Sequence, residues 1–388
     1  MNILNLKRIL AAAALTLAAQ ANAEDIDLFL GMPPSIAGAP NVLIILDNTG
    51  NWTAPFTEER GALEEVFTGL RGEKINVGLM MFTETGDGDS NVDGGYIRAA
   101  IRPMDVDPNA ERYAAMIAEF HVRDDKSNSG KAGLAMAEAY HYYKGASTAP
   151  LTPPWAGNNK NKTDWGTSFT ANDYNGPNAS TAVWALADNA LDSKSATIYN
   201  SPVDPTSCAK NYIIYISNGA VQDSNSDNRQ AETLLTLQRG DTAQISISPS
   251  GSADVVADEW ARFMKQSVLD ITTYTIDIDP VTTGQGPGWS ALLKSMADES
   301  GGSNFVAGST NLGNIVTEII NEILAVNSVF ASVALPAASN AQSTFLNRVY
   351  IGQFRPDENV KPRWPGNLKQ YKLGLSGTEV KVLDAADT

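Results

Sequence analysis

Three apolar runs, each ending in polar residues, constrain the fold of this chain more than any other feature. They are residues 42–46, followed at once by Asp47, then Asn211–Ser217, and Ile271–Ile278. A strand without polar alternation must be buried on both faces, as in a parallel sheet covered by helices on both sides. The runs therefore predict the central strands of an α/β domain.

Helical patterns alternate with these strands. The predicted helices cover residues 57–70, 108–122, 131–143, 227–238, 253–266, 289–299 and 312–326. Residues 75–82 and 96–101 predict two further strands that form a hairpin across a Gly/Asp-rich turn. The alternation predicts βαβ units and a doubly wound, mostly parallel sheet of the Rossmann-like class, over residues 39–326.

The N-terminus predicts export. Lys7 and Arg8 precede an apolar run (residues 9–19) and Ala21-Asn22-Ala23. This is the order of a secretory signal peptide, so we expect residues 1–23 to be removed and residues 24–38 to form a linker. The apolar run is too short to span a bilayer, and we expect no integral membrane segment in the mature protein.

The charge and cysteine content exclude other classes. The formal net charge is −16, so nucleic acid and anionic lipid are not expected partners. The one cysteine, Cys208, cannot form an internal disulfide.

Two regions interrupt the alternating pattern. Residues 145–207 form a Trp- and Asn-rich insertion with one helix expected near residues 179–191. Trp155, Trp165 and Trp184 in this insertion are either exposed partner-binding anchors or a small satellite core. Residues 327–388 form a β-rich tail, which we expect either to pad the main domain or to begin a larger one that is absent.

Oxygen-bearing side chains follow the first buried strand at alternate positions. They are Asp47, Thr49 and Asn51. Ligand sites in open α/β sheets form at the carboxyl ends of strands, so these residues could hold a hard cation. An Asx-turn that caps the following helix explains them equally well.

The buried strand that ends in Asp47-x-Thr49-x-Asn51 resembles the metal-ion-dependent adhesion site of von Willebrand factor A domains. Longer strings resemble PilY-type tip adhesins of type IV pili. They are Ala39-Pro40-Asn41-Val42-Leu43, Gly94-Gly95-Tyr96-Ile97-Arg98, Ile216-Ser217-Asn218-Gly219, Thr273-Tyr274-Thr275-Ile276-Asp277 and Arg363-Trp364-Pro365-Gly366-Asn367-Leu368. The last string resembles that family's join to a C-terminal propeller, which implies that the chain lacks the propeller.

The resemblance also implies further ligands for the cation. Ser129 matches the family's threonine best, with Ser127 as the alternative, and Asn218 stands where the family has Asp. The shell then carries one formal negative charge, so a site for Mg²⁺ or Ca²⁺ is expected to be weak or absent. Asp223, Asn225 and Asp227 are the second choice, as a calcium loop, against N-capping of the next helix.

Signals of catalysis are weak. His121 and His141 lie on predicted helices without a metalloprotease or serine-elbow pattern. The resemblance implies a non-enzymatic protein of adhesion and pilus biogenesis at the pilus tip or outer cell surface, with minor pilins, the pilus tip or a host or abiotic surface as partners. The alternatives are a periplasmic scaffold that never reaches the surface and a secreted metal-dependent α/β enzyme.

Overall fold

The structure is a computed structural model. It describes residues 38–49, 53–82, 94–120, 125, 127, 130–146, 163–165, 183–193, 196, 198–207, 209–220, 222–327, 330–334, 348–354, 366–376 and 379–383. The predicted signal peptide lies outside the described residues, as does all of the linker except Gly38. The described residues belong to two compact units, residues 37–327 and, in the second, residues 328–388.

The first unit is built on a six-stranded sheet with the order β3-β2-β1-β4-β5-β6. The strands are β1 (Asn41–Leu46), β2 (Asn76–Phe82), β3 (Gly95–Pro103), β4 (Asn211–Ser217), β5 (Ile271–Ile278) and β6 (Asn304–Ala307). Every neighbouring pair is parallel except β2 and β3, which pair antiparallel as the predicted hairpin. The predicted doubly wound, mostly parallel sheet is confirmed.

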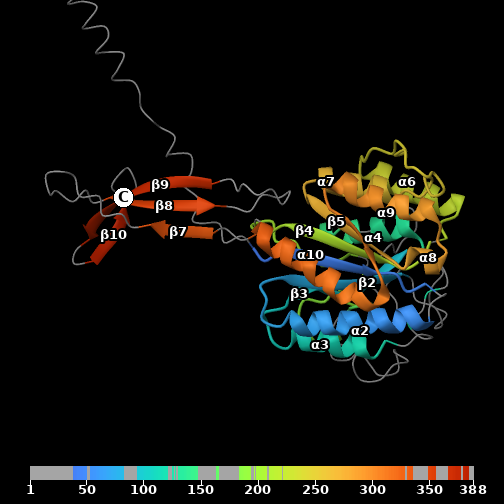
Figure 1. The fold of residues 1–388 in the computed structure, drawn as a ribbon, viewed down its shortest axis with the longest axis horizontal. Helices are drawn as coiled ribbons and strands as arrows, with labels where there is room; N and C mark the ends of the chain where they lie inside the picture. Colours follow the sequence, from blue (N-terminus) through green and yellow to red (C-terminus); the bar gives the residue numbers. More distant parts are fainter. Residues whose placement is uncertain are drawn as a thin grey trace, which may run out of the picture. The chain divides into compact units, whose positions relative to one another are not determined.

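Helices cover both faces of this sheet (Figure 1). One layer holds α2 (Thr53–Gly69), α3 (Asn109–Ala118) and α10 (Leu312–Asn327); the other holds α4 (Ala132–Lys144), α6 (Asn225–Leu237), α7 (Ala257–Gln266) and α9 (Pro287–Ser300). Alternate residues of one strand serve the two layers: Val42 and Ile44 pack toward α2, whereas Leu43 and Ile45 pack toward α4. This is why the strands are apolar throughout.

Two local predictions differ from the structure. The short edge strand β6 was not predicted, because it has four residues and is only partly buried. The helix expected near residues 179–191 is wrong over its described part, where only residues 183 and 184 are helical. Asp188 there has a φ of 59°, in the left-handed region that interrupts a helix.

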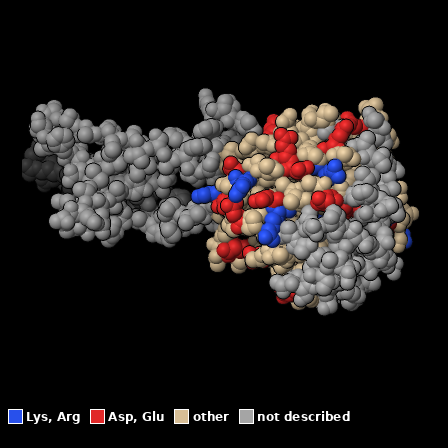
Figure 2. All heavy atoms as spheres, turned by 90° about the horizontal axis from the view of Figure 1, so that it is seen from below, with Lys and Arg blue, Asp and Glu red and all other residues tan. Residues whose placement is uncertain are grey.

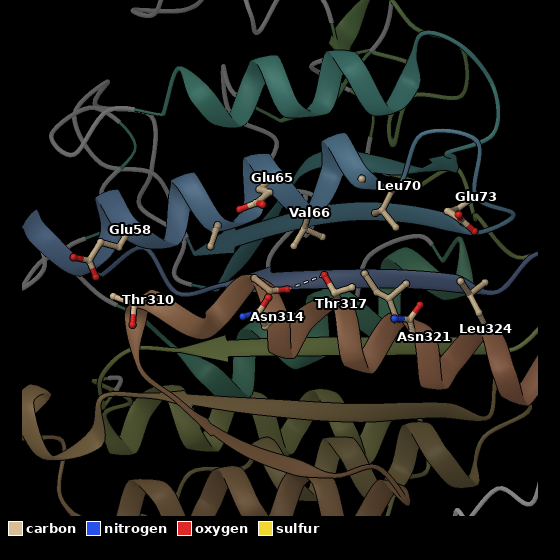
Figure 3. A pocket seen from close by; sticks show the side chains of 14 residues that line it. Glu58, Glu65, Val66, Leu70, Glu73, Thr310, Asn314, Thr317, Asn321 and Leu324 are labelled. Atoms are coloured by element: carbon tan, nitrogen blue, oxygen red, sulfur yellow. Dashed lines mark hydrogen bonds between the residues drawn. The ribbon is translucent and has the colours of Figure 1, made fainter.

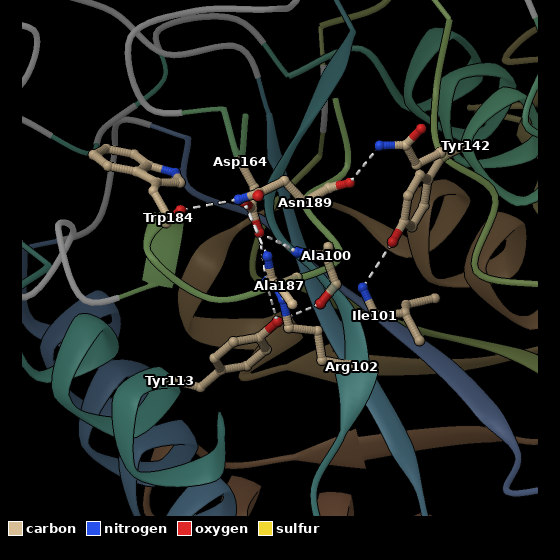
Figure 4. A network of polar contacts seen from close by, with 10 residues as sticks. Ala100, Ile101, Arg102, Tyr113, Tyr142, Asp164, Trp184, Ala187 and Asn189 are labelled. Atoms are coloured by element: carbon tan, nitrogen blue, oxygen red, sulfur yellow. Dashed lines mark hydrogen bonds and ion pairs between the residues drawn. The ribbon is translucent and has the colours of Figure 1, made fainter. Parts of the chain in front are cut away.

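A buried ion pair ties the insertion to the edge strand β3 (Figure 4). Arg102 on β3 donates to both carboxylate oxygens of Asp164, at 2.6 and 3.2 Å. Both side chains are almost fully buried, with 1% and 0% exposed. The guanidinium also donates to the Ala187 carbonyl at 2.6 Å and to the Tyr113 hydroxyl at 2.7 Å. The charge of Arg102 is therefore well supplied with partners.

The same network covers the backbone of the edge strand. The Asp164 amide donates to the Ile97 carbonyl at 2.9 Å, and its carboxylate accepts from the Ala100 amide at 2.7 Å. The Ile101 amide donates to the Tyr142 hydroxyl at 2.7 Å. An open edge strand is a template for pairing with another chain. In β3 these backbone groups are hydrogen-bonded to Asp164 of the insertion and to the Tyr142 side chain instead.

The described tryptophans of the insertion are buried. Trp165 and Trp184 are 7% and 1% exposed, so neither is an exposed anchor. Trp165 packs into the main core beside residues of β3 and α4, not into a separate satellite core. Trp184 lies 5.3 Å from the buried Arg98 guanidinium, measured to the ring centroid. Trp155 lies outside the described residues, and its role in partner binding stays a prediction.

The second unit contains a four-stranded antiparallel sheet with the order β10-β9-β8-β7. Its strands are β7 (Phe330–Ala334), β8 (Arg348–Phe354), β9 (Gly366–Ser376) and β10 (Glu379–Leu383). The described strands of the tail therefore pair with one another. Whether it begins a larger domain stays a prediction. Within the described residues no helix has the length and apolar character needed to cross a membrane.

We predict that Asp164→Ala lowers the free energy of unfolding by about 3–5 kcal/mol, because it leaves the Arg102 charge buried and unpaired. The double variant Arg102→Met/Asp164→Ala should lose less than the sum of the two single changes. Urea unfolding measures both.

Asp298→Ala is the matched control, since it breaks an exposed Lys294–Asp298 pair and should cost about 1 kcal/mol or less. An Asp164→Ala protein as stable as this control would contradict the structural role of the pair.

Candidate binding site at the carboxyl edge of the sheet

The candidate site lies where the strand order reverses. β1 and β4 are neighbours in the middle of the sheet, and the chain continues outward from them in opposite directions. Asp47 follows β1 and Asn218 follows β4 at the same edge. Ligands of open α/β sheets bind at this switch point, outside the carboxyl ends of the strands. The fold thus brings together two predicted residues that are 171 positions apart.

Asn48 holds the loops around the site in place. Its side chain accepts from the Phe82 amide at 2.9 Å and donates to the Asp125 carbonyl at 2.8 Å. The backbone carbonyl of Asn48 accepts from the Ser127 amide at 2.6 Å, and Thr49 pairs with Ser127 in an isolated β-bridge. The second loop of the predicted site therefore lies against Thr49, with Ser127 as the described residue beside it.

A third residue, Glu59 of α2, completes a buried polar cluster with Asp47 and Asn218. The Asn218 amide nitrogen donates to both carboxylate oxygens of Glu59, at 3.0 and 2.9 Å, and to the Asp47 carbonyl at 3.1 Å. Asp47 Oδ1 accepts from the Thr49 amide at 2.9 Å. Two buried oxygens within the described structure, Asp47 Oδ2 and Asn218 Oδ1, have no hydrogen-bond partner.

Burial governs the protonation of this cluster. It raises the pKa of Asp47 from 3.8 to about 6, although hydrogen bonds from Thr49 and Asn218 oppose the rise. It raises the pKa of Glu59 well above its usual value, against the hydrogen bond from Asn218, and the negative charges of Asp47 and Asp279 add to the rise. Burial thus favours the neutral form of both acids in this cluster.

Sequence reasoning missed Glu59, although a signal was present. Glu59 lies three residues after Phe56 and four before Leu63, so it falls on the apolar stripe of α2, where an exposed carboxylate is not expected. Its side chain is fully buried. An ionisable residue on the apolar face of a helix indicates a buried polar site. The sequence pattern showed this signal at Glu59.

The acidic residues of the predicted calcium loop make other contacts within the protein, and calcium binding there stays a prediction. The Asp223 carboxylate accepts from the amides of Ala132 and Gly133 at 3.0 and 3.3 Å, and so caps the start of α4. Asp227 forms a capping box with Ser224 and an ion pair with Lys131 at 3.0 Å. Asn225 is exposed. The lysine supplies the positive charge that a calcium ion was expected to bring.

The fit of a divalent cation rests on the two unpartnered oxygens. Asp47 Oδ2 and Asn218 Oδ1 are of the type that Mg²⁺ and Ca²⁺ prefer, and Thr49 lies beside them. The predicted ligands Asn51 and Ser129 lie outside the described residues. No group of three or more His, Cys, Asp or Glu side chains that could hold a metal occurs in the described part of the chain. The described residues thus fit a weakly held cation.

A separate groove of about 630 Å³ lies between α2 and α10 (Figure 3). Glu58, Glu65 and Glu73 line the α2 side, and Asn314 and Asn321 line the α10 side. Acidic and basic side chains are interspersed on the face in Figure 2, without one dominant patch. Charge alone therefore does not mark a binding surface on this face.

Comparisons with known proteins identify no family. No protein-family model matches the chain, and no curated protein does either. Among solved structures it is similar to proximal thread matrix protein 1 from the mussel byssus, with 9% identity and a TM-score of 0.35 over 76% of this chain and 49% of that one. A structure of that protein with a zinc-occupied MIDAS motif has 10% identity and the same TM-score of 0.35.

A mutant of the PilB minor pilin from Streptococcus sanguinis has 12% identity and a TM-score of 0.35, over 73% of this chain and 60% of that one. The chain thus spans about half the length of the mussel protein and 60% of the minor pilin. Likenesses at this TM-score say nothing about what the chain binds.

We predict that Asp47→Asn weakens the pH dependence of stability between about pH 4 and 7. The folded-state pKa of Asp47 is raised to about 6, so its stabilising protonation is complete below pH 3.8 and is lost as the pH rises through 6. At about 1.4 kcal/mol per pKa unit, the wild type should lose up to about 3 kcal/mol more than the variant over this range. Urea unfolding at both pH values measures the difference.

Asp105→Asn, at an exposed carboxylate, controls for the loss of one surface charge. Equal pH dependence in the wild type and Asp47→Asn would show that the Asp47 carboxylate is not buried as described.

Proposed function

We propose that this chain is an exported, non-enzymatic binding protein of the von Willebrand A type, which acts in adhesion and in type IV pilus biogenesis. Its partners in this proposal are minor pilins or the pilus tip on one side and a host or abiotic surface on the other. The proposal places it at the pilus tip or outer cell surface after transit through the periplasm.

The observation that carries the proposal is the cluster of Asp47, Asn218 and Glu59 at the switch point of the sheet. Polar side chains are fully buried there, and two of their oxygens have no partner. An unsatisfied buried polar group costs about 1–3 kcal/mol, so a folded chain retains it where a ligand uses it. The resemblance of Asp47-x-Thr49-x-Asn51 to an adhesion site supports a protein partner.

The groups around the cluster support binding over catalysis. The Ser217 hydroxyl accepts from the Trp289 indole at 2.9 Å and donates to the Gly219 carbonyl at 3.2 Å, so its proton is not directed at a base. His141 lies within α4, where its Nδ1 contacts the Ala137 carbonyl at 2.7 Å. A nucleophile needs a base within hydrogen-bond reach, and the Ser217 hydroxyl instead donates to a backbone carbonyl.

The cation has a limited part in this proposal. Asp47 and Asn218 would hold it, together with Thr49, and it would supply a positive charge for a carboxylate of the partner. The side-chain nitrogen of Asn218 donates to Glu59, so the side-chain oxygen Oδ1 of Asn218 is the atom that remains for the cation. Asp47 is the one acidic side chain among these three ligands, so affinity is expected to be low.

We predict that calorimetry on the folded protein detects no Mg²⁺ binding tighter than the millimolar range, because Mg²⁺ gives up its waters reluctantly without several carboxylates. Asp47→Ala should behave like the wild type. Micromolar Mg²⁺ binding by the wild type that disappears in Asp47→Ala would overturn the weak-site interpretation.

Localisation in the native host tests the pilus assignment. We predict that a tagged full-length chain is recovered with sheared pili, and that it leaves this fraction in a strain without the major pilin. The cells should also adhere less when the gene is deleted, and the wild-type gene should restore adhesion. Recovery from the periplasm alone would favour the scaffold alternative and contradict surface adhesion.

A further inference from the structure

A second polar hollow, of about 290 Å³, lies away from the Asp47 cluster. One wall is a face of α6 that carries Asn225, Asn228 and Glu232, and α7 contributes Glu259. The segment between these helices closes the hollow with Gln244 and other residues. This volume lies just below the range of about 300–1,000 Å³ that is usual for ligand pockets, and it suits one small ring.

The walls of this hollow are held in place by hydrogen bonds. The Ile245 amide donates to Glu259 Oε1 at 2.8 Å, and Gln244 donates to the Ala253 carbonyl. Arg262 of α7 donates to the carbonyls of Asp241 and Ala243 at 3.0 and 2.9 Å. The segment that closes the hollow is therefore fixed to α7, and the hollow is formed before a ligand arrives.

Asn228 is the group in this hollow that needs a ligand. Its side chain is 7% exposed, and neither the amide oxygen nor the amide nitrogen has a hydrogen-bond partner in the described structure. Buried amides are almost always paired in folded proteins. An ordered water can hydrogen-bond to one end of the amide. A buried Asn side chain without a protein partner at either end is nevertheless unusual, because its burial costs free energy.

The two ends of this amide limit the chemistry of the ligand. A metal ion or an ammonium group cannot accept a hydrogen bond, so it would leave Nδ2 unpaired. A carboxylate or a fully ionised phosphate cannot donate one, so it would leave Oδ1 unpaired, and Glu232 and Asp254 at the hollow would repel it. Two neighbouring hydroxyl groups both donate and accept, and serve the two ends together.

The remaining polar groups favour several hydroxyls over a single amide. Glu259 is 3% exposed, and burial raises its pKa to about 8 with a further rise from Asp258, so it too can donate or accept. Thr242, Gln244 and Arg229 also line the hollow. A peptide group can hydrogen-bond to one donor and one acceptor of the hollow. A sugar ring has a hydroxyl on most of its carbons, so it can hydrogen-bond to polar groups on all sides of the hollow.

We propose that the hollow between α6 and α7 is a carbohydrate site that takes one neutral sugar ring, with Asn228 hydrogen-bonded to two neighbouring hydroxyls. The site goes beyond the proposed binding at Asp47 and does not depend on it, because the two use different side chains. It assigns a neutral glycan as a ligand class for this chain.

Saturation-transfer NMR and titration with free monosaccharides test the site. The probes are glucose, galactose, mannose, fucose and N-acetylglucosamine at millimolar concentrations, with the whole chain. We expect at least one of them to bind the wild type, and Asn228→Ala to weaken that binding by about tenfold or more, as the loss of the amide implies. Asn228→Asp, which lacks the donor, should weaken it as well.

Stability separates this role from a structural one. Because Asn228 makes no protein hydrogen bond through its side chain, Asn228→Ala should not lower the melting temperature by more than about 2 °C. Asn321→Ala, at an exposed Asn on α10, is the matched control and should change neither binding nor stability. A chelator should leave sugar binding unchanged, which keeps this result independent of the cation at Asp47.

Three outcomes would overturn the proposal. The first is no binding of any of the sugars to the wild type, which leaves water as the occupant. The second is sugar binding that Asn228→Ala retains. The third is binding of acetamide or methylammonium to the wild type, lost in Asn228→Ala, without binding of a sugar, which would assign the hollow to a peptide amide or an amine.

Discussion

The contact between Arg102 and Asp164 decides how the first unit can be organised. The sheet ends at β3, which pairs with a single neighbour, β2, and would otherwise present free backbone groups. Asp164 binds that backbone and the guanidinium at once, with Asn189 donating to the same carboxylate at 2.7 Å. A residue of the insertion thereby becomes part of the sheet. The burial of Trp165 and Trp184 follows, because the insertion is packed where Asp164 anchors it.

The buried acidic and amide side chains of this chain differ in how many hydrogen bonds they receive. Asp164 accepts hydrogen bonds at both of its buried oxygens, and Asp223 accepts two from the start of α4, so both stabilise the fold. Asp47 and Asn218 each retain one buried oxygen without a partner, and Asn228 retains a whole amide. Burying these groups costs free energy, and no hydrogen bond within the described structure offsets that cost. Other buried atoms, such as Glu138 Oε2 and Thr273 Oγ1, also lack partners. The two candidate sites differ from these in that Asp47 and Asn218 meet at the switch point of the sheet, and in that both ends of the Asn228 amide lack partners beside a hollow.

The sequence predicted the elements whose signal is local. β4 and β5 have the predicted bounds, because a strand buried on both faces is apolar along its whole length. It did not predict partners that the fold brings together. Asp223 caps a helix that begins about 90 positions earlier, so its use could not be read from the spacing of Asp223, Asn225 and Asp227. Glu59 did carry a local signal, its place on the apolar stripe of α2, but its partner Asn218 lies 159 positions away and could not be predicted.

The connection from β4 to α6 relates the two sites to each other. It begins with Asn218 at the Asp47 cluster and leads to Asn228 in the hollow, and Asp223 lies between them. Asp223 is bound to the start of α4, and Lys131 from the same helix end pairs with Asp227. These contacts fix the described part of the segment to the start of α4. Coupling between sites requires a two-state element, so the fold favours two sites that bind their ligands independently.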